Sequence, residues 1–469
     1  MLIYKKLIIY FNLLFSLIIL DKMRVLKFGG SSISIEGLKR MKKIISSHLD
    51  NGEKIIIVFS AMQDTTDLLY KTAVDGKNML NEIKENHIKI IKELSLPLDL
   101  LDPEFDFLKE TVDDLNSNPL ASHQTCKKIQ IIGSGEILST KFITEYFSSN
   151  FSKVKRISAL RFIQNVNKVT DIDPHTLTIH GEFKADSKII YNLMADSNIM
   201  ITQGFIARTA DDRMCIMTRS GSDTTACLIG AAIGCSVEIW TDVSGIYTSD
   251  PRIVPFAKVI NNLSYDICQE ISVMGSHVIH PLAIKPCKEA KVDIFIKNTR
   301  KPDDIGTRIS CENYYKDVYA ISLQKNISVI QVSSLDMWNH SGFSGRFFSF
   351  FSKYEIDINI ITTSSDTITI TTESNNENSP EKLDKLYNDL IKNFTNVKYY
   401  PNQTIVSLIG NDLLIKDKEI NEKIIKIVNM YEYGLSVFQM GSNRKYLSYG
   451  FNHDTAINFS RALHKEIFE

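Results

Sequence analysis

The sequence has 469 residues, a length that predicts roughly three domains at about 150 residues each. Its 54 Lys+Arg against 55 Asp+Glu give a formal net charge of −1, which provides no global charge for binding nucleic acid or an anionic surface. The hydrophobic fraction of 43% and the charged fraction of 23% are ordinary globular values and exclude wholesale disorder. The seven cysteines are scattered without a CxxC pair, which argues against a zinc site or a disulfide framework and favours a reducing compartment.

The chain begins with an apolar run. Residues 7–20 read LIIYFNLLFSLIIL after two lysines, as in the charged and apolar regions of a signal peptide. The run is shorter than the roughly 20 apolar residues that a spanning helix needs, and no small-residue cleavage site follows it. Met23 then opens a strand-like segment. We expect Met23 to be the true initiator and residues 1–22 to be upstream sequence; the alternative is a membrane address.

From Met23 to about Ile309, short apolar strands alternate with helical stretches. This alternation predicts an open α/β sheet with mostly parallel strands. Apolar residues at helical spacing predict a helix over Ile35–Leu49, and residues 65–150 are predicted to be mostly helical, forming an extended cap over the sheet. The predicted strands are Val25–Phe28, Ile55–Ser60, Ile199–Phe205, Val237–Thr241 and Val292–Lys297.

The pattern changes after Lys301–Asp304, where two successive strand–helix–strand–strand–helix units are predicted. Such a repeat is typical of ferredoxin-like modules. We therefore predict a catalytic domain over residues 23–310 and two appended units over residues 318–398 and 399–469. The expected elements are strands at Val329–Val332, Asp357–Thr363, Thr367–Thr372, Thr404–Ile409, Leu435–Gln439 and Lys445–Tyr449, and helices at Phe343–Lys353, Pro380–Phe394, Glu419–Tyr431 and Asp454–Ile467.

The first candidate site is the sequence KFGGSS, which ends the first strand and opens the first helix. Gly29 and Gly30 allow backbone N–H groups to approach a polyphosphate, and a helix N-terminus favours anions. Lys27 can place a point charge on a transferred phosphoryl group. The alternative is an ordinary tight turn.

Two further segments suit a small polar substrate. SAMQDTTD follows the second strand, where α/β sheets place ligand loops, and its hydroxyls include those of Ser60 and Thr66. GSGE precedes the apolar stretch Ile137–Phe147, and Glu136 can receive an ammonium group. The alternatives are a helix N-cap in the first segment and, in the second, a first-turn glutamate favoured by the helix dipole.

The sequence TRSGSDTTA precedes a helix of small residues, Ala226–Gly234. Arg219 suits bidentate capture of a carboxylate, and Asp223 can position a nucleophile or orient Lys27. After the strand Val237–Thr241 comes TDVSGIYTSDPR, whose Asp, Tyr and Arg can frame a nucleotide. For both segments the alternative is a solvated surface loop.

These motifs in this order, with ITQGFIA and GSHVIHP, resemble aspartokinases of the amino-acid kinase family. The chain also ends as they do, in two ACT-type regulatory units, and MWNHSGF, INIITTS and VSLIGNDL are most similar to the lysine-sensitive, monofunctional kind. The resemblance covers Met23 to Glu469. It implies ATP-dependent phosphorylation of the β-carboxylate of L-aspartate, with Mg²⁺ carried by the nucleotide, in the cytoplasm.

The resemblance also assigns roles to residues. Lys27 is expected to stabilise the transferring phosphoryl group and Asp223 to organise the reacting groups. The residues expected to hold aspartate are Ser60, Thr66, Glu136 on the ammonium group and Arg219 on the α-carboxylate. The residues expected to bind ATP are Lys27, Phe28, Gly29, Gly30, Thr241, Asp242, Tyr247, Arg252, His277 and Val278. Aspartate is already ionised at pH 7, so no strong general base is required.

Some positions depart from the family pattern. Ser220 replaces a glycine near the substrate, and His277 replaces a lysine near ATP, which removes that cation's full charge. The expected regulatory residues are Met337, Gly342, Phe343, Ser344, Asn359, Thr363, Ser364 and Ser365. The resemblance implies that lysine-sensitive relatives have an aspartate at the position of Asn359 and commonly a glutamate at that of Ser365. We therefore expect feedback by lysine to be retuned, weakened or directed to another amino acid.

Two alternatives to an active aspartokinase remain open from the sequence. One is a non-catalytic amino-acid sensor on a relic kinase fold, which the retention of Lys27, Glu136, Arg219 and Asp223 disfavours. The other is a kinase acting on glutamate or its acetyl derivative, which the ACT pair disfavours. ACT units usually pair across subunits, so the resemblance implies a homodimer or a dimer of dimers and no nucleic-acid partner.

Overall fold

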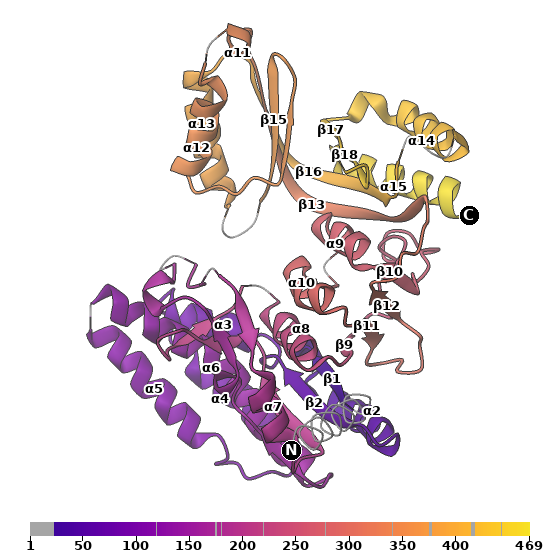
Figure 1. Cartoon of the computed structure of the whole chain (residues 1–469). Coiled ribbons are helices and arrows are strands. Elements are labelled where there is room, and N and C mark those ends of the chain that lie inside the picture. Colours follow the sequence, from indigo (N-terminus) through magenta and orange to yellow (C-terminus); the bar gives the residue numbers. More distant parts are fainter. Residues whose placement is uncertain are drawn as a thin grey trace, which may run out of the picture. The chain divides into compact units, whose positions relative to one another are not determined.

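The computed structural model describes residues 23–118, 120–173, 176–179, 181–218, 220–276, 278–339, 341–374, 378–413, 418–441 and 443–469. The predicted N-terminal extension, Arg219 and His277 lie outside the described residues. Contacts divide the chain into two compact units (Figure 1). Of the described residues, the first unit comprises those up to Ile246 with Asn261–Tyr265 and Val278–Glu312, and the second comprises those in Tyr247–Ile260, 266–276 and Asn313–Glu469.

The first unit is built on an eight-stranded sheet in the order β10-β12-β11-β9-β1-β2-β6-β3. Strand β1 (Met23–Phe28) lies between β2 (Lys54–Phe59) and β9 (Val237–Thr241) and is parallel to both. The carboxyl ends of these three strands therefore meet at one edge, where the strand order reverses and where α/β sheets bind ligands. The predicted α/β fold with a mostly parallel sheet is confirmed.

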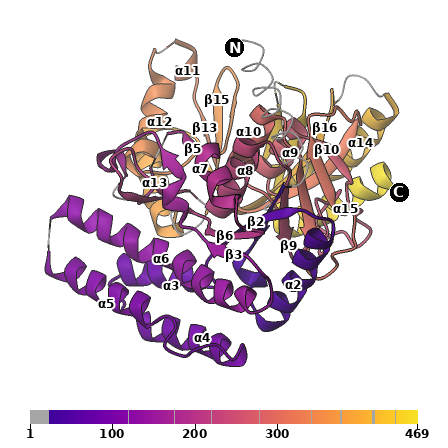
Figure 2. The same cartoon turned by 60° about the horizontal axis from the view of Figure 1, so that its bottom comes forward.

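Helices cover both faces of this sheet. On one face, the Lys27 side chain of β1 meets α8 (Gly221–Ile233) through Asp223. On the other face, Glu238 of β9, in register with Leu26, lies 3.3 Å from His48 Nε2 of α2 (Ile35–Asp50). Because successive side chains of a strand alternate between faces, α8 and α2 lie on opposite sides (Figure 2). Because helices cover both faces of the sheet, side chains on both faces of β2 are buried, which explains its nearly continuous apolar sequence KIIIVF.

The other helices of this unit are α3 (Thr65–Ala73), α4 (Leu80–Glu93), α5 (Asp102–Ser117), α6 (Ala121–Ser148), α7 (Ser187–Met194), α10 (Pro281–Ala290) and the short η1 (Gly30–Ser32), η2 (Ala159–Arg161) and η3 (Val169–Asp171). The remaining strands of the main sheet are β3 (Val154–Arg156), β6 (Ile199–Gln203), β10 (Asn262–Ser264), β11 (Ile294–Asn298) and β12 (Thr307–Ser310). A second, four-stranded sheet contains β4 (Ile163–Asn165), β5 (Phe183–Ala185), β7 (Ile206–Arg208) and β8 (Met214–Ile216).

Helix α6 differs from the sequence prediction. Its 28 residues include GSGE in mid-helix, whereas we predicted a helix that begins after that motif. Gly133 and Gly135 lower helix propensity by about 1 kcal/mol each, but they let the helix pack closely against its neighbours. A methyl group added at Gly133 would lie 2.9 Å from Ile206 Cγ2, and one at Gly135 would lie 2.8 Å from Ala61 Cβ. The glycines thus bring Glu136 close to the loop after β2.

The second unit contains a six-stranded antiparallel sheet in the order β14-β15-β13-β16-β18-β17. Its central strands, β13 (Val318–Ser333) and β16 (Val397–Gly410), are much longer than predicted and pair along most of their length. The predicted repeat of strand–helix–strand–strand–helix is present twice. Its other elements are α11 (Asp336–Asn339), α12 (Phe343–Lys353), α13 (Pro380–Asn393), α14 (Lys418–Tyr431), η4 (Glu432–Gly434), α15 (His453–Phe468), β14 (Ile360–Thr363), β15 (Thr367–Glu373), β17 (Val437–Met440) and β18 (Tyr446–Asn452).

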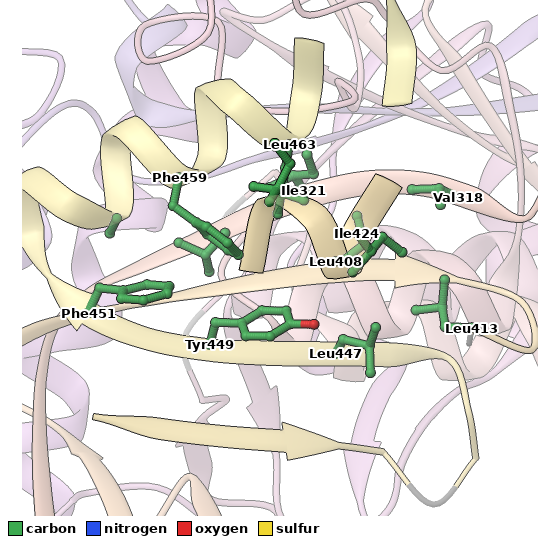
Figure 3. Packing of buried hydrophobic residues seen from close by; sticks show 13 residues of the cluster. Val318, Ile321, Leu408, Leu413, Ile424, Leu447, Tyr449, Phe451, Phe459 and Leu463 are labelled. Carbon is green, nitrogen blue, oxygen red and sulfur yellow. The ribbon is translucent and has the colours of Figure 1, made fainter. Parts of the chain in front are cut away.

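Each repeat has its own apolar core, and the two cores share the long strands. Val318 and Ile321, at the start of β13, pack with residues of β16, β18, α14 and α15 (Figure 3). Ile330 and Val332, at the end of β13, pack instead with α12, β15 and α13. The first half of β13 therefore contributes to the core of the second repeat, and its second half to that of the first.

No helix among the described residues is both long enough and apolar enough to cross a membrane.

Candidate functional site

The centre of the candidate site is an ion pair between the end of β1 and the first turn of α8. Lys27 Nζ lies 2.6 Å from Asp223 Oδ1, and the two side chains are only 13% and 9% exposed. Two ions so far removed from water stabilise each other, and removing either one leaves a buried charge without its partner. The pair thus fixes an ammonium group at the carboxyl edge of the sheet.

The loop after β1 approaches the loop after β2. Gln63 N donates to Gly30 O at 3.2 Å, and a methyl group at Gly30 would lie 2.1 Å from Ala61 O. Gly30 is therefore required by the packing of the protein itself. Gly29 is different, because its φ is −75° and an added methyl group would meet Lys27 Nζ at 3.8 Å, an ordinary contact. The packing of the chain therefore tolerates a side chain at Gly29, in contact with Lys27, but not at Gly30.

Two side chains of α6 hold the loop after β2. Ala61 N donates to Glu136 Oε1 at 3.2 Å, and Met62 N donates to Ser139 Oγ at 2.8 Å. The two side chains are three residues apart and lie on one face of the helix. This arrangement places Glu136 beside the same loop that contacts Gly30.

Glu136 is buried, with 3% of its surface exposed, and no described residue pairs with its Oε2 atom. Burial disfavours the charged carboxylate and raises the pKa of Glu136 to about 8, although the hydrogen bond from Ala61 N opposes the shift. A buried acceptor without a partner is costly. An ammonium group of a ligand would both pair with Oε2 and restore the ionised form.

The start of α8 is held against the loop after β6. A methyl group added at Gly204 would lie 2.4 Å from Ser222 Cβ, so the two segments are in close contact. Ser220, the N-cap of α8, has φ 58° and ψ 28°, a left-handed conformation that suits glycine and that a serine adopts with strain. A glycine, which the resemblance implies at this position, would adopt this conformation without strain. The neighbouring Arg219 lies outside the described residues.

Ser60 and Thr66 lie on either side of the loop after β2. Ser60 N donates to Phe28 O at 3.3 Å, and Thr66 is the second residue of α3; both are half-buried. Phe28 itself is fully buried, with its ring 5.7 Å from Phe59 and 6.2 Å from Trp240. Only the backbone of Phe28 is therefore available to a nucleotide.

The residues predicted to bind ATP fall in different parts of the chain. Half-buried Thr241 ends β9 and donates to Asp242 Oδ1 at 3.2 Å, and Asp242 is exposed. Val278 belongs with them to the first unit, whereas Tyr247 and Arg252 belong to the second. His277 lies outside the described residues.

Arg252 already has a partner. Its Nε lies 3.0 Å from Asp250 Oδ1 and its Nη2 lies 2.8 Å from Asp250 Oδ2, although its side chain is 88% exposed. Burial of Asp250 opposes its ionisation, but hydrogen bonds from Arg252 outweigh burial and lower the pKa of Asp250. A phosphate at Arg252 would have to compete with this carboxylate.

The residues predicted to bind an effector all belong to the first repeat. Gly342 caps α12 with φ 86°, which favours glycine, and the next residue, Phe343, is buried in the core. Met337 packs against that core, and the predicted residues Ser344, Asn359, Thr363, Ser364 and Ser365 are exposed. Thr363 and Ser364 line a polar cavity together with residues of β15 and β17.

Two residues near the predicted groups were missed from the sequence. Ser139 holds the loop after β2. Its i+3 spacing from Glu136 would have indicated this role if the predicted helix had included GSGE. His280 is the N-cap of α10, where its Nδ1 accepts from Leu282 N at 3.3 Å. Burial lowers the pKa of His280 while the negative charge of Asp223 opposes the shift, so His280 lies within electrostatic range of the ion pair.

Among the described residues, no group of three or more His, Cys, Asp or Glu side chains is arranged to hold a metal ion. Asp223 is paired with Lys27.

Comparison with known proteins gives consistent similarities. Residues 22–298 match the model of the amino acid kinase family. Aspartokinase 2, chloroplastic, of Arabidopsis thaliana is 28% identical over 95% of this chain and 84% of its own length, and lysine-sensitive aspartokinase 3 of Escherichia coli is 24% identical over 95% and 99%. The crystal structure of Clostridium acetobutylicum aspartate kinase matches with a TM-score of 0.74 at 25% identity, covering 94% of this chain and 99% of that one. The resemblance predicted from the motifs is confirmed.

Gly29 and Gly30 give a prediction about folding. The Gly30→Ala variant should lose about 1–3 kcal/mol of stability, because its methyl group would collide with Ala61 O. The Gly29→Ala variant should unfold within about 1 kcal/mol of the parent, because its conformation and surroundings accept a methyl group. Urea unfolding followed by circular dichroism compares the two, and equal losses would show that Gly29 is also fixed by packing.

Proposed function

We propose that this chain, which belongs to the amino acid kinase family, is an aspartate kinase that transfers the γ-phosphoryl group of ATP to the β-carboxylate of L-aspartate. The product is 4-phospho-L-aspartate, the first intermediate towards lysine, threonine and methionine. The observation that carries the proposal is the buried Lys27–Asp223 pair beside Gly29, at the edge where the parallel strands end. Aspartokinases similar along nearly the full chain support the choice of substrate.

The reaction requires positioning and charge neutralisation. A β-carboxylate oxygen of aspartate attacks the γ-phosphorus, the bond from that phosphorus to the β,γ-bridging oxygen breaks, and ADP leaves with the bond's electron pair. No proton is removed, because the attacking carboxylate is ionised at neutral pH. Lys27 stabilises negative charge on the phosphoryl oxygens, and Asp223 holds the Lys27 ammonium group in place.

Aspartate is held by groups of complementary charge. Glu136 receives the ammonium group at Oε2, Arg219 binds the α-carboxylate, and the hydroxyls of Ser60 and Thr66 add hydrogen bonds. The pairing at Glu136 offsets the cost of burying its carboxylate, so aspartate binding and ionisation of Glu136 are linked.

ATP is bound by the loop after β1 and by the segment after β9. Backbone N–H groups at Phe28, Gly29 and Gly30 approach the phosphates. The other residues assigned to ATP are Thr241, Asp242, Tyr247, Arg252, His277 and Val278. Mg²⁺ enters on the nucleotide phosphates, where it neutralises charge. The reaction takes place in the cytoplasm, where ATP and aspartate are available.

Regulation is assigned to the appended units. Along the sequence we assign residues 23–310 to the kinase domain, 318–398 to the first ACT unit and 399–469 to the second, preceded by the extension 1–22. Their pairing across subunits would give a homodimer or a dimer of dimers. An amino-acid effector binds near Asn359 and Ser365, and the loss of two negative charges there weakens or redirects lysine binding.

Replacing Lys27 tests the proposed catalytic role. The parent protein, with ATP, Mg²⁺ and aspartate, should form an acyl phosphate that hydroxylamine traps as a hydroxamate. Lys27→Met should lower this rate by at least about 100-fold through loss of the charge on the phosphoryl group. It should also destabilise the fold, because Asp223 remains buried without its partner.

A double variant separates these two effects. Lys27→Met with Asp223→Asn removes both charges, so stability should recover towards the parent while activity stays lost. Lys54→Met is the matched control, because Lys54, at the start of β2, donates from Nζ to the carbonyls of Met194 and Ala195 and forms no ion pair among the described residues. No hydroxamate from the folded parent protein would refute the aspartate kinase proposal and favour a non-catalytic sensor.

The second prediction concerns Glu136. The parent should bind aspartate more tightly as pH is raised towards about 8, because the ligand-free carboxyl is protonated below that pH and only its ionised form pairs with ammonium. Glu136→Gln should raise KM for aspartate by about tenfold or more and remove this pH dependence. The measurement is the KM for aspartate from pH 6 to pH 8.5. Identical pH profiles in the two proteins would remove Glu136 from the ammonium site.

The regulatory proposal predicts a response to lysine. Lysine should inhibit the parent protein weakly, and Asn359→Asp with Ser365→Glu should increase its sensitivity by restoring two negative charges near the ligand. The assay is the hydroxamate rate titrated with lysine, threonine and methionine. Strong inhibition of the parent protein by lysine, without either substitution, would contradict the proposal.

A further inference from the structure

The segment Tyr247–Ile260 follows β9 but belongs to the second unit. It folds back on itself, with Thr248 N donating to Lys258 O at 2.8 Å and Tyr247 bridging to Val259. Ile321 N of β13 donates to Thr248 O at 2.8 Å, which joins the segment to the six-stranded sheet. A segment expected to carry nucleotide-binding residues is thus held by the regulatory part of the chain.

The C-terminal helix α15 holds the same segment through two side chains. His464, which is fully buried, has its Nε2 atom 2.9 Å from Thr248 Oγ1 across 216 residues of sequence. Arg461, one turn earlier, donates from Nε to Ile253 O at 2.9 Å. The two bonds tie both halves of the Tyr247–Ile260 segment to one helix face.

The neighbouring groups show which atom carries the hydrogen in the Thr248–His464 bond. Lys258 N donates to Thr248 Oγ1 at 3.0 Å, so the hydroxyl hydrogen is free to point at His464 Nε2. Nε2 then accepts, and the ring hydrogen is on Nδ1, which faces Glu469 Oε1 at 3.6 Å. Burial lowers the pKa of His464, which favours the neutral ring that this arrangement needs.

We propose that His464 and Thr248 are positioning residues for the nucleotide: the bond between them holds the Tyr247–Ile260 segment in the shape that binds ATP. This inference rests on the proposed function, because it takes Tyr247 and Arg252 as nucleotide contacts. Tyr247 directly precedes Thr248, and Arg252 lies between Thr248 and Ile253, the two anchored residues. Fixing such a segment before binding avoids an entropy cost on binding and so increases affinity.

The test compares two Thr–His bonds made to the same helix. Thr248→Val removes the hydroxyl with little change of shape, and His464→Leu removes the ring nitrogen. The matched control is Thr404→Val, since Thr404 is also buried and its Oγ1 lies 3.2 Å from His453 Nδ1 at the other end of α15, far along the sequence from the loop. Thr248→Ser and His464→Gln keep a hydrogen-bonding group and should retain parent behaviour.

The readouts are binding of ADP by calorimetry and amide hydrogen exchange of the peptide 247–260, neither of which depends on aspartate. Thr248→Val and His464→Leu should each weaken ADP binding about three- to tenfold, as expected for one lost hydrogen bond, and should speed exchange in that peptide. In the active enzyme, KM for ATP should rise in parallel while KM for aspartate stays unchanged. Thr404→Val should change neither ADP binding nor exchange of the peptide.

Three results would overturn the inference. Unchanged ADP binding in Thr248→Val would do so even if exchange of the peptide increased, because the bond would then hold the loop without serving the nucleotide. An equal loss in Thr404→Val would attribute the effect to general loosening of α15. Equal rises of both KM values would indicate general damage. The proposed function has its own test: if the parent protein forms no hydroxamate with aspartate, that function is wrong whatever the ADP-binding results.

Discussion

The parallel pairing of β1 with both β2 and β9 is the constraint on which the candidate site depends. It brings the loops after three strands to one edge and aims Lys27 at the first turn of α8. Without this alignment Lys27 and Asp223, 196 positions apart in the sequence, would not form a buried pair. The pair in turn supplies a fixed positive charge around which phosphoryl transfer is proposed.

Close backbone approach is the second requirement, and glycine provides it at several contacts. Gly30 lies against Ala61, Gly135 of α6 lies against the same residue, and Gly204 lies against Ser222 of α8. These contacts join the loops after β1, β2 and β6 to the helices that carry Glu136 and Asp223. Ser220 is the exception, because it occupies a left-handed conformation without being a glycine. The site therefore contains local strain at a residue next to the predicted carboxylate-binding Arg219.

Much of this arrangement could be predicted from the sequence. Strands with strong apolar runs, such as β2, and the order of the motifs were sufficient to predict the sheet and the family. The position of Glu136 in mid-helix was not predictable, because glycines normally weaken helices and their role here is packing against distant residues. The three-residue strands β4, β7 and β8 have no periodic signal of their own. The bond of Thr248 to His464 joins residues 216 positions apart, which no local pattern reveals.

In the proposed reaction the β-carboxylate of aspartate, and no other group, accepts the phosphoryl group at the Lys27–Asp223 centre. Borohydride reduction of the freshly formed product tests this most directly, because it converts an acyl phosphate into an alcohol at the phosphorylated carbon. We expect the reduced product to be homoserine, formed in proportion to the ADP released and at least about 100-fold more slowly by Lys27→Met. A product reduced at the α-carboxyl, 3-amino-4-hydroxybutanoate, or ADP released with no reducible product, would contradict it.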